Sequence, residues 1–296
     1  MATVAEWVEG ARPRTLPAAI APVVAGAGVS AFTGSSLSQS AAILHAVLAL
    51  IVALALQIGV NYYNDFHDGI RGTDQVRVGP VRLVGQGLAA PTKVRTAALI
   101  SLGVAAAVGL LLVILSRAWV LLPVGAAAIL AAWGYTGGSR PYGYAGLGEL
   151  FVFVFFGPVA VCGTTAVTGG EVWPLAVLTS VAVGLLTVAI LVANNLRDVK
   201  LDAEAGKHTL AVRLGEDRTR AFFALCLMVC FVLVAWIALT STWWSLLGML
   251  GAIPAVKASQ EVLEHAYGRG LIPVLQETSL ALLLTGIGLG VGFLIG

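Results

Sequence analysis

Long uninterrupted apolar segments dominate this sequence and restrict what it can fold into. About 20 apolar residues carry a helix across the hydrocarbon core of a bilayer, and residues 219–240 form the clearest such segment. Hydrophobic residues make up 58% of the chain and charged residues only 11%, whereas a soluble globular domain carries about 25% charged residues. The sequence therefore predicts an integral membrane protein.

Nine segments have the length and apolarity of membrane-spanning helices. They are residues 15–33, 41–63, 96–115, 118–136, 147–167, 172–195, 219–240, 242–262 and 274–295. The eighth is the weakest, because Lys257 and Glu261 lie near its end. Strands of membrane barrels alternate apolar and polar residues over about 10 positions, whereas these segments are continuously apolar. We predict an all-α fold with one transmembrane domain over residues 1–296.

The positions of the basic residues predict an orientation. If all nine segments cross the membrane, every Lys and Arg except Arg117 falls on one side. Cytoplasmic loops are enriched in Lys and Arg, so we predict a cytoplasmic N-terminus, an external C-terminus and a site that faces the cytoplasm. Glu6, Glu9 and Arg12 precede the first segment, so we expect no cleaved signal peptide. The expected location is the cell membrane, with the lipid bilayer and not nucleic acid as partner.

Two long polar connections resemble each other. The first reads NYYNDFHDGIRGTD at 61–74 and later VRLVG at 81–85, and the second reads NNLRDVKLDAEAGKHT at 194–209 and then VRLG at 212–215. Each begins where an apolar segment ends, the second and the sixth. We interpret this as two related four-helix halves followed by a ninth helix. The predicted cytoplasmic cap consists of three connections, about 64–95, 137–146 and 196–218.

Carboxylates and carboxamides recur in both connections at helical spacing. Because a helix turns about 100° per residue, four side chains of the first connection fall within an arc of about 100°. These are Asn61, Asn64, Asp65 and Asp68. In the second connection Asn194, Asp198 and Asp202 follow the spacing i, i+4, i+8, which also places them on one face. We expect two polar stripes, one at each helix end.

So many carboxylates beside a bilayer are unfavourable unless a cation lies between them. Mg²⁺ is the expected cation, because it prefers oxygen ligands and combines one or two carboxylates with phosphate oxygens. Asp74 follows Gly69 and Gly72 and can fold back toward the first stripe. The predicted metal ligands are Asn64, Asp65, Asp68, Asp74, Asn194, Asp198 and Asp202.

Basic residues accompany the aspartates on the same predicted side. They include Arg71, Arg82, Arg140, Arg197, Lys200, Lys207 and Arg213. Metal ions that bridge carboxylates to a diphosphate, with Arg and Lys on the free phosphate oxygens, form an effective clamp. The set therefore favours binding of a polyanion, although each base taken singly is equally well explained as a determinant of topology.

Several segments resemble a known family. NDFHD at 64–68 and NNLRDVKLD at 194–202 resemble the two aspartate-rich motifs of the UbiA-type membrane prenyltransferase superfamily, and the resemblance covers essentially the whole chain. Three further segments are similar to the menaquinone branch, the 1,4-dihydroxy-2-naphthoate polyprenyltransferases: GARPRTLPAAIAPVVAG at 10–26, DGIRGTDQVRVGPVRLVGQG at 68–87 and GSRPYGYAGLGE at 138–149. The first motif departs from the general pattern, because its third aspartate position is Gly72 here, and Asp74 is the substitute.

The resemblance implies an activity and roles. The enzyme would use Mg²⁺ to transfer a polyprenyl group from polyprenyl diphosphate to 1,4-dihydroxy-2-naphthoate, with loss of CO₂ and diphosphate, giving demethylmenaquinone. Electrostatic stabilisation of the leaving diphosphate would be the largest catalytic effect. The residues predicted as catalytic are Asp65, Asp68, Asp198, Asp202 and Arg140. The predicted substrate contacts are Asn64, Arg71, Arg82, Arg197, Lys207, Tyr142 and Tyr144.

Other functions fit the sequence less well than this one. Another aromatic acceptor, such as 4-hydroxybenzoate or homogentisate, is the nearest alternative, and the 138–149 segment favours the naphthoate. A CDP-alcohol phosphotransferase needs an Ala-Arg pair that DGIRG at 68–72 lacks. A cation-coupled transporter would place its charges near the bilayer midplane, whereas these charges lie at helix ends. The prenyl chain length and the oligomeric state do not follow from the sequence.

Overall fold

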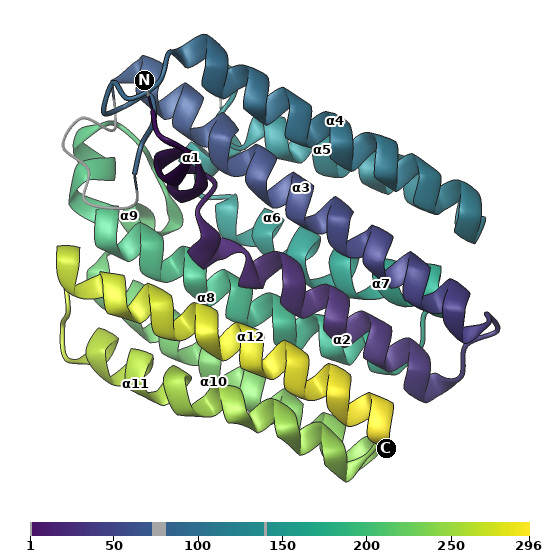
Figure 1. Ribbon diagram of the computed structural model, residues 1–296. Coiled ribbons are helices and arrows are strands. Elements are labelled where there is room, and N and C mark those ends of the chain that lie inside the picture. The colour runs from purple at the N-terminus through teal and green to yellow at the C-terminus, as the bar shows by residue number, and fades with distance from the viewer. Residues whose placement is uncertain (1, 73–80, 139–140) are drawn as a thin grey trace.

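The computed structural model describes residues 2–72, 81–138 and 141–296, and every regular element within those ranges is helical. The longer elements are α2 (Pro17–Thr33), α3 (Gln39–Arg71), α4 (Pro91–Ser116), α5 (Leu121–Gly134), α7 (Ala160–Gly169), α8 (Pro174–Glu204), α10 (Glu216–Thr240), α11 (Ala252–Leu263) and α12 (Leu271–Ile295). The shorter α-helices are α1 (Val4–Gly10), α6 (Gly148–Val154) and α9 (Leu210–Leu214). Figure 1 shows the long helices side by side in one bundle. The predicted all-α fold is confirmed.

The apolar helices support a multi-pass membrane protein. Among the described residues, six helical segments are long and apolar enough to cross a membrane, or seven if the bent pair Val4–Thr15 and Pro17–Thr33 counts as one span. Two predicted segments give shorter α-helices. α5 has only 14 residues, and the eighth predicted segment starts as the 3₁₀-helix Trp243–Gly251 before α11. The count of nine spans therefore stays a prediction.

Two helices extend past their apolar segments into the polar motifs. α3 continues to Arg71 and α8 to Glu204, so both aspartate motifs are helical. α3 stops at Gly72, which adopts a left-handed conformation with φ of 71°. Glycine adopts this conformation without the steric penalty of a side chain. The first motif therefore departs from the general pattern at Gly72, the residue where α3 ends.

Small residues let the central helices approach closely. A Cβ atom built on Gly28 of α2 would lie 2.6 Å from the Cα of Gly290 in α12. Membrane helices often associate through such small residues, because no hydrophobic effect drives them together inside the bilayer. Figure 1 accordingly shows α2 and α12 packed alongside each other.

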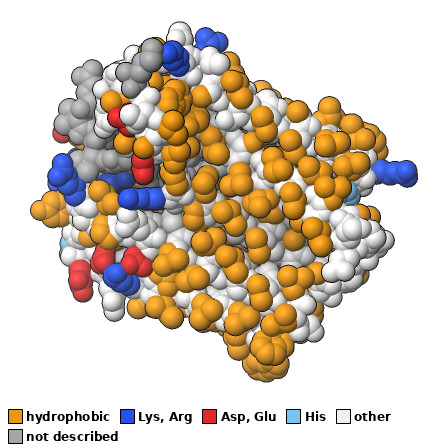
Figure 2. Space-filling view, viewed as in Figure 1, with side chains coloured by type: hydrophobic (Ala, Val, Ile, Leu, Met, Phe, Trp, Pro, Cys, Tyr) orange, Lys and Arg blue, Asp and Glu red, His pale blue; other side chains and the backbone are white. Residues whose placement is uncertain are grey.

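Charged side chains gather at one end of the bundle. Figure 2 shows them at the left, where α1 and α9 lie in Figure 1, while hydrophobic side chains cover most of the remaining visible surface. Arg117 lies at the opposite end, as the C-cap of α4. Many of the large apolar side chains on the surface, such as Trp236 and Val232 of α10, are more than half exposed. The distribution fits a band of lipid contact with one polar cap.

Candidate active site

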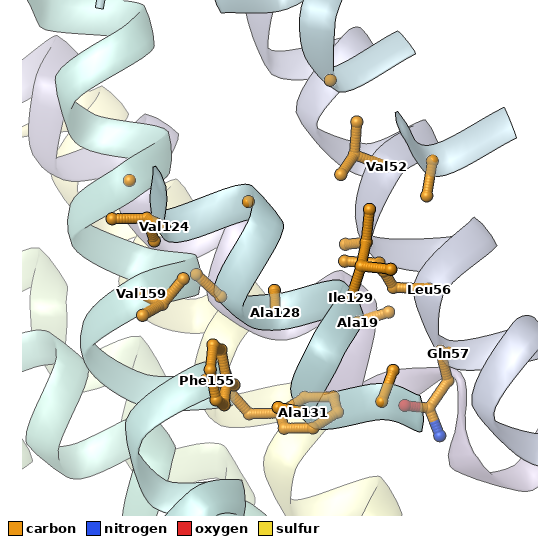
Figure 3. A pocket seen from close by; sticks show the side chains of 18 of the residues that line it. Ala19, Val52, Leu56, Gln57, Val124, Ala128, Ile129, Ala131, Phe155 and Val159 are labelled. Atoms are coloured by element: carbon orange, nitrogen blue, oxygen red, sulfur yellow. The ribbon is translucent and has the colours of Figure 1, made fainter. Parts of the chain in front are cut away.

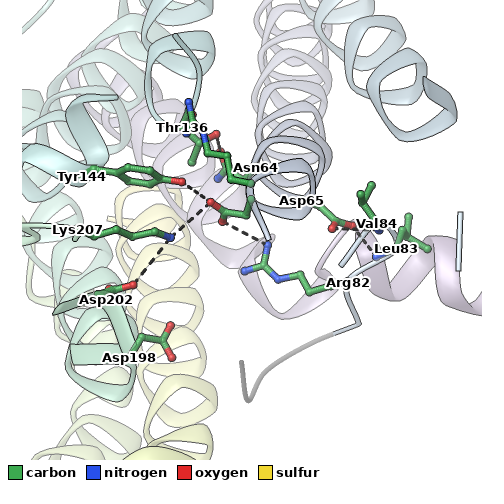
Figure 4. A network of polar contacts seen from close by, with 12 residues as sticks. Asn64, Asp65, Arg82, Leu83, Val84, Thr136, Tyr144, Asp198, Asp202 and Lys207 are labelled. Carbon is green, nitrogen blue, oxygen red and sulfur yellow. Dashed lines mark hydrogen bonds and ion pairs between the residues drawn. The ribbon is translucent and has the colours of Figure 1, made fainter. Parts of the chain in front are cut away.

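The two predicted motifs meet at the charged end. Lys207 lies beside Asp202 of α8 in Figure 4, and its ammonium group also approaches Asp68 of α3. The Lys207 Nζ is 3.5 Å from Asp68 Oδ1 and 3.9 Å from Asp202 Oδ1. All three side chains are buried. The structure thus brings one carboxylate from each stripe to a single ammonium group.

Tyr144 completes the surroundings of Asp68. Its hydroxyl donates a hydrogen bond to Asp68 Oδ1, and the Lys207 Nζ lies 4.4 Å from the centroid of its ring. Tyr144 belongs to the 3₁₀-helix Tyr142–Ala145, and its carbonyl accepts a hydrogen bond of 2.8 Å from the His208 amide. Burial, reinforced by the negative charge of Asp68, raises the pKa of Tyr144. The phenol therefore stays protonated and keeps donating to Asp68 in neutral solution.

Arg82 approaches Asp68 from the connection after α3. Its Nη1 is 4.0 Å from Asp68 Oδ2, and both side chains are buried. The neighbouring residues Leu83 and Val84 donate their amides to Asp65, at 2.7 Å to Oδ2 and 3.3 Å to Oδ1. Asp65 thereby holds the backbone that carries Arg82. That Asp65 also binds a metal stays a prediction.

The other amide side chains of the first stripe contact the surrounding chain. Asn64 accepts a hydrogen bond of 2.8 Å from Thr136. Asn61 donates to the Ala11 carbonyl at 2.9 Å and to Thr15 Oγ1 at 3.0 Å. These contacts attach α3 to the N-terminal segment and to the end of α5. The Thr136 contact was not predicted, and its sequence offers no distinctive signal.

The second stripe contains its own ion pair. Arg197 binds the carboxylate of Asp198 through two hydrogen bonds, at 2.8 Å from Nε and 2.7 Å from Nη2. This two-point geometry is the strongest form of Arg–carboxylate contact. Asn194, a predicted ligand on the same face, is half-buried.

Glu149 is a buried acid that the motif analysis missed. It lies in the first turn of α6 and accepts a hydrogen bond of 2.8 Å from Asn195 of α8. Both residues are buried, so the contact links α6 to the helix that carries Asp198 and Asp202. A carboxylate at the start of an apolar segment is the signal that could have revealed it.

The remaining predicted residues lie around this centre. Arg71 donates to the carbonyls of Thr136 and Gly138, both at 2.7 Å, and its guanidinium lies 5.5 Å from the Tyr144 ring centroid. The Tyr142 hydroxyl donates to the Ala131 carbonyl at 2.8 Å. Asp74 and Arg140 lie outside the described residues.

The donors at this centre suit Mg²⁺ in type. No group of three or more His, Cys, Asp or Glu side chains converges as a ready-made metal site within residues 2–72, 81–138 and 141–296. Asp68 and Asp202 nevertheless both lie within 4 Å of the Lys207 ammonium group. Mg²⁺ commonly binds through one or two carboxylates and takes its remaining ligands from water and substrate phosphate. This pair of carboxylates meets that requirement.

An apolar cavity of about 530 Å³ adjoins this centre. Figure 3 shows Phe155 and Val159 on one of its walls and Val52 and Leu56 of α3 on another. Its polar lining residues include Arg12, Gln57, Asn61 and Asn64. Asn64 lies one helical turn before Asp68, so the cavity opens beside the carboxylates.

The comparison with family models decides the family. The model of the UbiA prenyltransferase family matches residues 19–269, which is most of the chain and includes both motifs. The chain belongs to the UbiA prenyltransferase family. The polar centre and the apolar cavity are therefore features of a UbiA-family prenyltransferase.

Curated relatives of this UbiA-family chain match it over nearly its whole length. The 1,4-dihydroxy-2-naphthoate octaprenyltransferase of Mycobacterium tuberculosis is 54% identical, covering 96% of this chain and 95% of the relative. The protein of the same name from Escherichia coli is 37% identical, covering 95% and 92%. Identity at this level over the full length supports a shared fold and a shared type of reaction.

Solved structures show the same fold. A UbiA homolog from Archaeoglobus fulgidus, bound to GPP and Mg²⁺, superposes with a TM-score of 0.67 and 15% identity, covering 98% of this chain and all of that one. A UbiA homolog from Aeropyrum pernix gives a TM-score of 0.66 and 17% identity, covering 94% and 97%. At these identities the likeness establishes the arrangement of helices for this UbiA-family chain.

Proposed function

We propose that this protein transfers a polyprenyl group from polyprenyl diphosphate to 1,4-dihydroxy-2-naphthoate. The observation that carries the proposal is the polar centre around Asp68, Asp202 and Lys207 beside an apolar cavity. A diphosphate needs such charges, and an isoprenoid tail needs such a cavity. The 54% identity to a 1,4-dihydroxy-2-naphthoate octaprenyltransferase supports the choice of acceptor.

Asp68 and Asp202, with Asp198 beside them, are the residues proposed to hold Mg²⁺. The homolog solved with GPP and Mg²⁺ supports this cofactor. When bound, the metal neutralises diphosphate charge and so improves the leaving group. Asp65, Asp74, Asn64 and Asn194 stay predicted members of the ligand set.

Basic side chains of this chain are proposed to bind the diphosphate directly. Lys207 and Arg82 lie within 4.0 Å of Asp68, so they surround the place where metal-bound phosphate oxygens would lie. The Arg71 guanidinium lies 5.5 Å from the centroid of the Tyr144 ring. These donors stabilise charge that grows as the bond between C1 and the bridging oxygen breaks, and that bond's electron pair leaves with the diphosphate.

The remaining steps concern an allylic cation and the acceptor. Aromatic faces such as that of Tyr144 stabilise a cation, and the apolar cavity keeps water from it. The ring carbon that bears the carboxylate attacks C1, and the electrons of the broken C–CO₂ bond then restore the aromatic ring. No base is needed to remove a proton from that ring carbon, because the ring loses CO₂ from it instead. The direct product is the quinol form of demethylmenaquinone.

We propose that the domain spans the membrane nine times with its polar cap in the cytoplasm. The gathering of charged side chains at one end of the bundle supports this orientation. The two motif helices, α3 and α8, end at that same cap, as two related halves would require. Single cysteines introduced at Lys93 and Lys200 should react with an impermeant thiol reagent only from the cytoplasmic side. Reaction from outside would overturn the orientation.

A reconstitution experiment tests the activity. Purified protein in lipid nanodiscs would receive octaprenyl diphosphate with dihydroxynaphthoate, 4-hydroxybenzoate or homogentisate, and mass spectrometry would identify the products. We expect a decarboxylated prenyl naphthoquinol, loss of turnover with a chelator, and recovery with Mg²⁺. Product with another acceptor alone would contradict the naphthoate proposal, and turnover that ignores the chelator would contradict the metal proposal.

A further inference from the structure

A cluster of side chains from four helices lines the end of the apolar cavity that is farthest from the polar centre. Val23 of α2, Ala49 of α3, Leu112 of α4 and Val167 of α7 are buried, pack together and also line the cavity. Ala49 and Asn64 lie fifteen residues apart on α3, so the cavity follows about 22 Å of that helix from the polar centre inward. We call these four residues the floor cluster.

Three of the described glycines line the cavity, and two of them, Gly109 and Gly163, lie on helices that also carry floor residues. Gly109 of α4 and Gly163 of α7 both line the cavity. A Cβ atom built on Gly163 would meet nothing within 4 Å, and one built on Gly109 would meet only Val52 Cγ2, at 3.8 Å. Packing therefore requires glycine at neither position.

This freedom distinguishes them from the glycines that hold the bundle together. On Gly26 of α2 a Cβ atom would lie 2.5 Å from the Val161 carbonyl, and on Gly59 of α3 it would lie 2.9 Å from Leu102. Glycine within a helix costs about 1 kcal/mol relative to alanine. At Gly109 and Gly163 no close approach of a neighbouring helix offsets that cost. The absence of a side chain at these positions instead leaves space in the cavity.

We propose that the floor cluster, Gly109 and Gly163 set the length of prenyl chain that the enzyme prefers. The last isoprene units of the donor lie between Gly109 and Gly163 and end against the floor cluster. A larger side chain at either glycine removes that space while leaving the diphosphate site untouched. This inference rests on the proposed prenyl transfer and deepens it, by naming residues that select the donor.

The test compares variants across a series of donors. Gly163→Leu and Gly109→Leu would be assayed in nanodiscs with geranyl, farnesyl, geranylgeranyl and octaprenyl diphosphates. We expect near wild-type kcat/KM with geranyl diphosphate and a loss of at least 10-fold with octaprenyl diphosphate. Gly163→Ala should give a smaller loss in the same direction.

Gly103→Leu is the matched control. Gly103 lies on α4 like Gly109, is exposed, and would also meet nothing within 4 Å on gaining a Cβ atom, yet it does not line the cavity. We expect its donor preference to match the wild type. A similar shift in donor preference in this control would overturn the proposal.

A variant of the floor tests the opposite direction. Leu112→Ala lengthens the cavity, so its preference should move toward longer donors relative to the wild type. Equal effects of the glycine variants on all four donors would overturn the proposal, as would no effect on any of them. Failure of the wild type to transfer any prenyl group would instead contradict the proposed function, so the two failures are distinguishable.

Discussion

The two aspartate-bearing helix ends of this protein differ in how their carboxylates are held. At the end of α3, Asp65 accepts two backbone amides from the following connection. At the end of α8, Asp198 binds its own neighbour, Arg197. In each helix the last carboxylate of the stripe, Asp68 or Asp202, lies within 4 Å of the Lys207 Nζ.

The two similar motifs are therefore stabilised by different means. The α3 end depends on a connection that also supplies Arg82, so Asp65 affects Asp68 through the backbone. The α8 end carries its neutralising cation within the same helix. We therefore expect substitutions at the α3 end to disturb both loop position and charge, and substitutions at the α8 end to disturb charge alone.

The largest expected effect comes from the two carboxylates beside Lys207. Asp68→Asn and Asp202→Asn should each reduce kcat by at least about 100-fold, because each removes charge that holds the diphosphate clamp. Turnover measured in nanodiscs at saturating Mg²⁺ checks this. Asp217→Asn, at an exposed acid near the start of α10, is the control and should retain activity. A large loss of kcat in only one of Asp68→Asn and Asp202→Asn would show that the two carboxylates have unequal roles.

The next effect concerns the shared cation. Lys207→Ala should lower kcat/KM about 10- to 100-fold, because a buried donor to charged oxygens is lost. Lys207→Arg should recover part of the activity. Lys200→Ala is the matched control, since the Lys200 side chain is 80% exposed. If both Ala variants behaved alike, the contacts of Lys207 with the two helix ends would have no catalytic role.

Asp65 gives the sharpest test of the difference between the helix ends. Asp65→Ala leaves the buried amide of Leu83 and the half-buried amide of Val84 without their acceptor. A buried amide without an acceptor costs about 1–3 kcal/mol, and a half-buried one costs less because water can reach it. We expect a marked loss of thermal stability in Asp65→Ala and a milder loss in Asp65→Asn, because Asn keeps one acceptor oxygen. In Asp65→Asn we also expect a smaller fall in kcat than in Asp68→Asn, with an unchanged Mg²⁺ requirement. A shifted Mg²⁺ requirement would instead make Asp65 a metal ligand.

The smallest effect concerns Tyr144. Tyr144→Phe removes one hydrogen bond to Asp68, for which we expect about a 10-fold fall in kcat/KM. The donor is the neutral phenol, which persists below its pKa, and burial raises that pKa. The ratio of wild-type to variant kcat/KM should therefore stay constant from about pH 6 to 9. A ratio that falls toward one as the pH rises within this range would show that the phenol ionises there.

Much of the architecture followed from the sequence. Each predicted apolar segment contains helix, and the helical spacing of the aspartates was correct because α3 and α8 continue into the motifs. The lengths of α5 and α11 were less predictable. Hydropathy reports which residues tolerate lipid, whereas the change from 3₁₀-helix to α-helix at Ala252 depends on local packing.

An all-helical membrane protein with two aspartate motifs at helix ends could be predicted from the sequence, because apolar length and helical spacing are local properties. Which carboxylates come together at Lys207 depends on tertiary packing. Lys207 is 139 positions from Asp68, and Tyr144 is 76 positions from it. Such contacts depend on how the helices and their connections pack, so no local pattern encodes them. Helix spacing placed Asp65 and Asp68 on one face, but only packing directed the first to a backbone connection and the second to the shared cation.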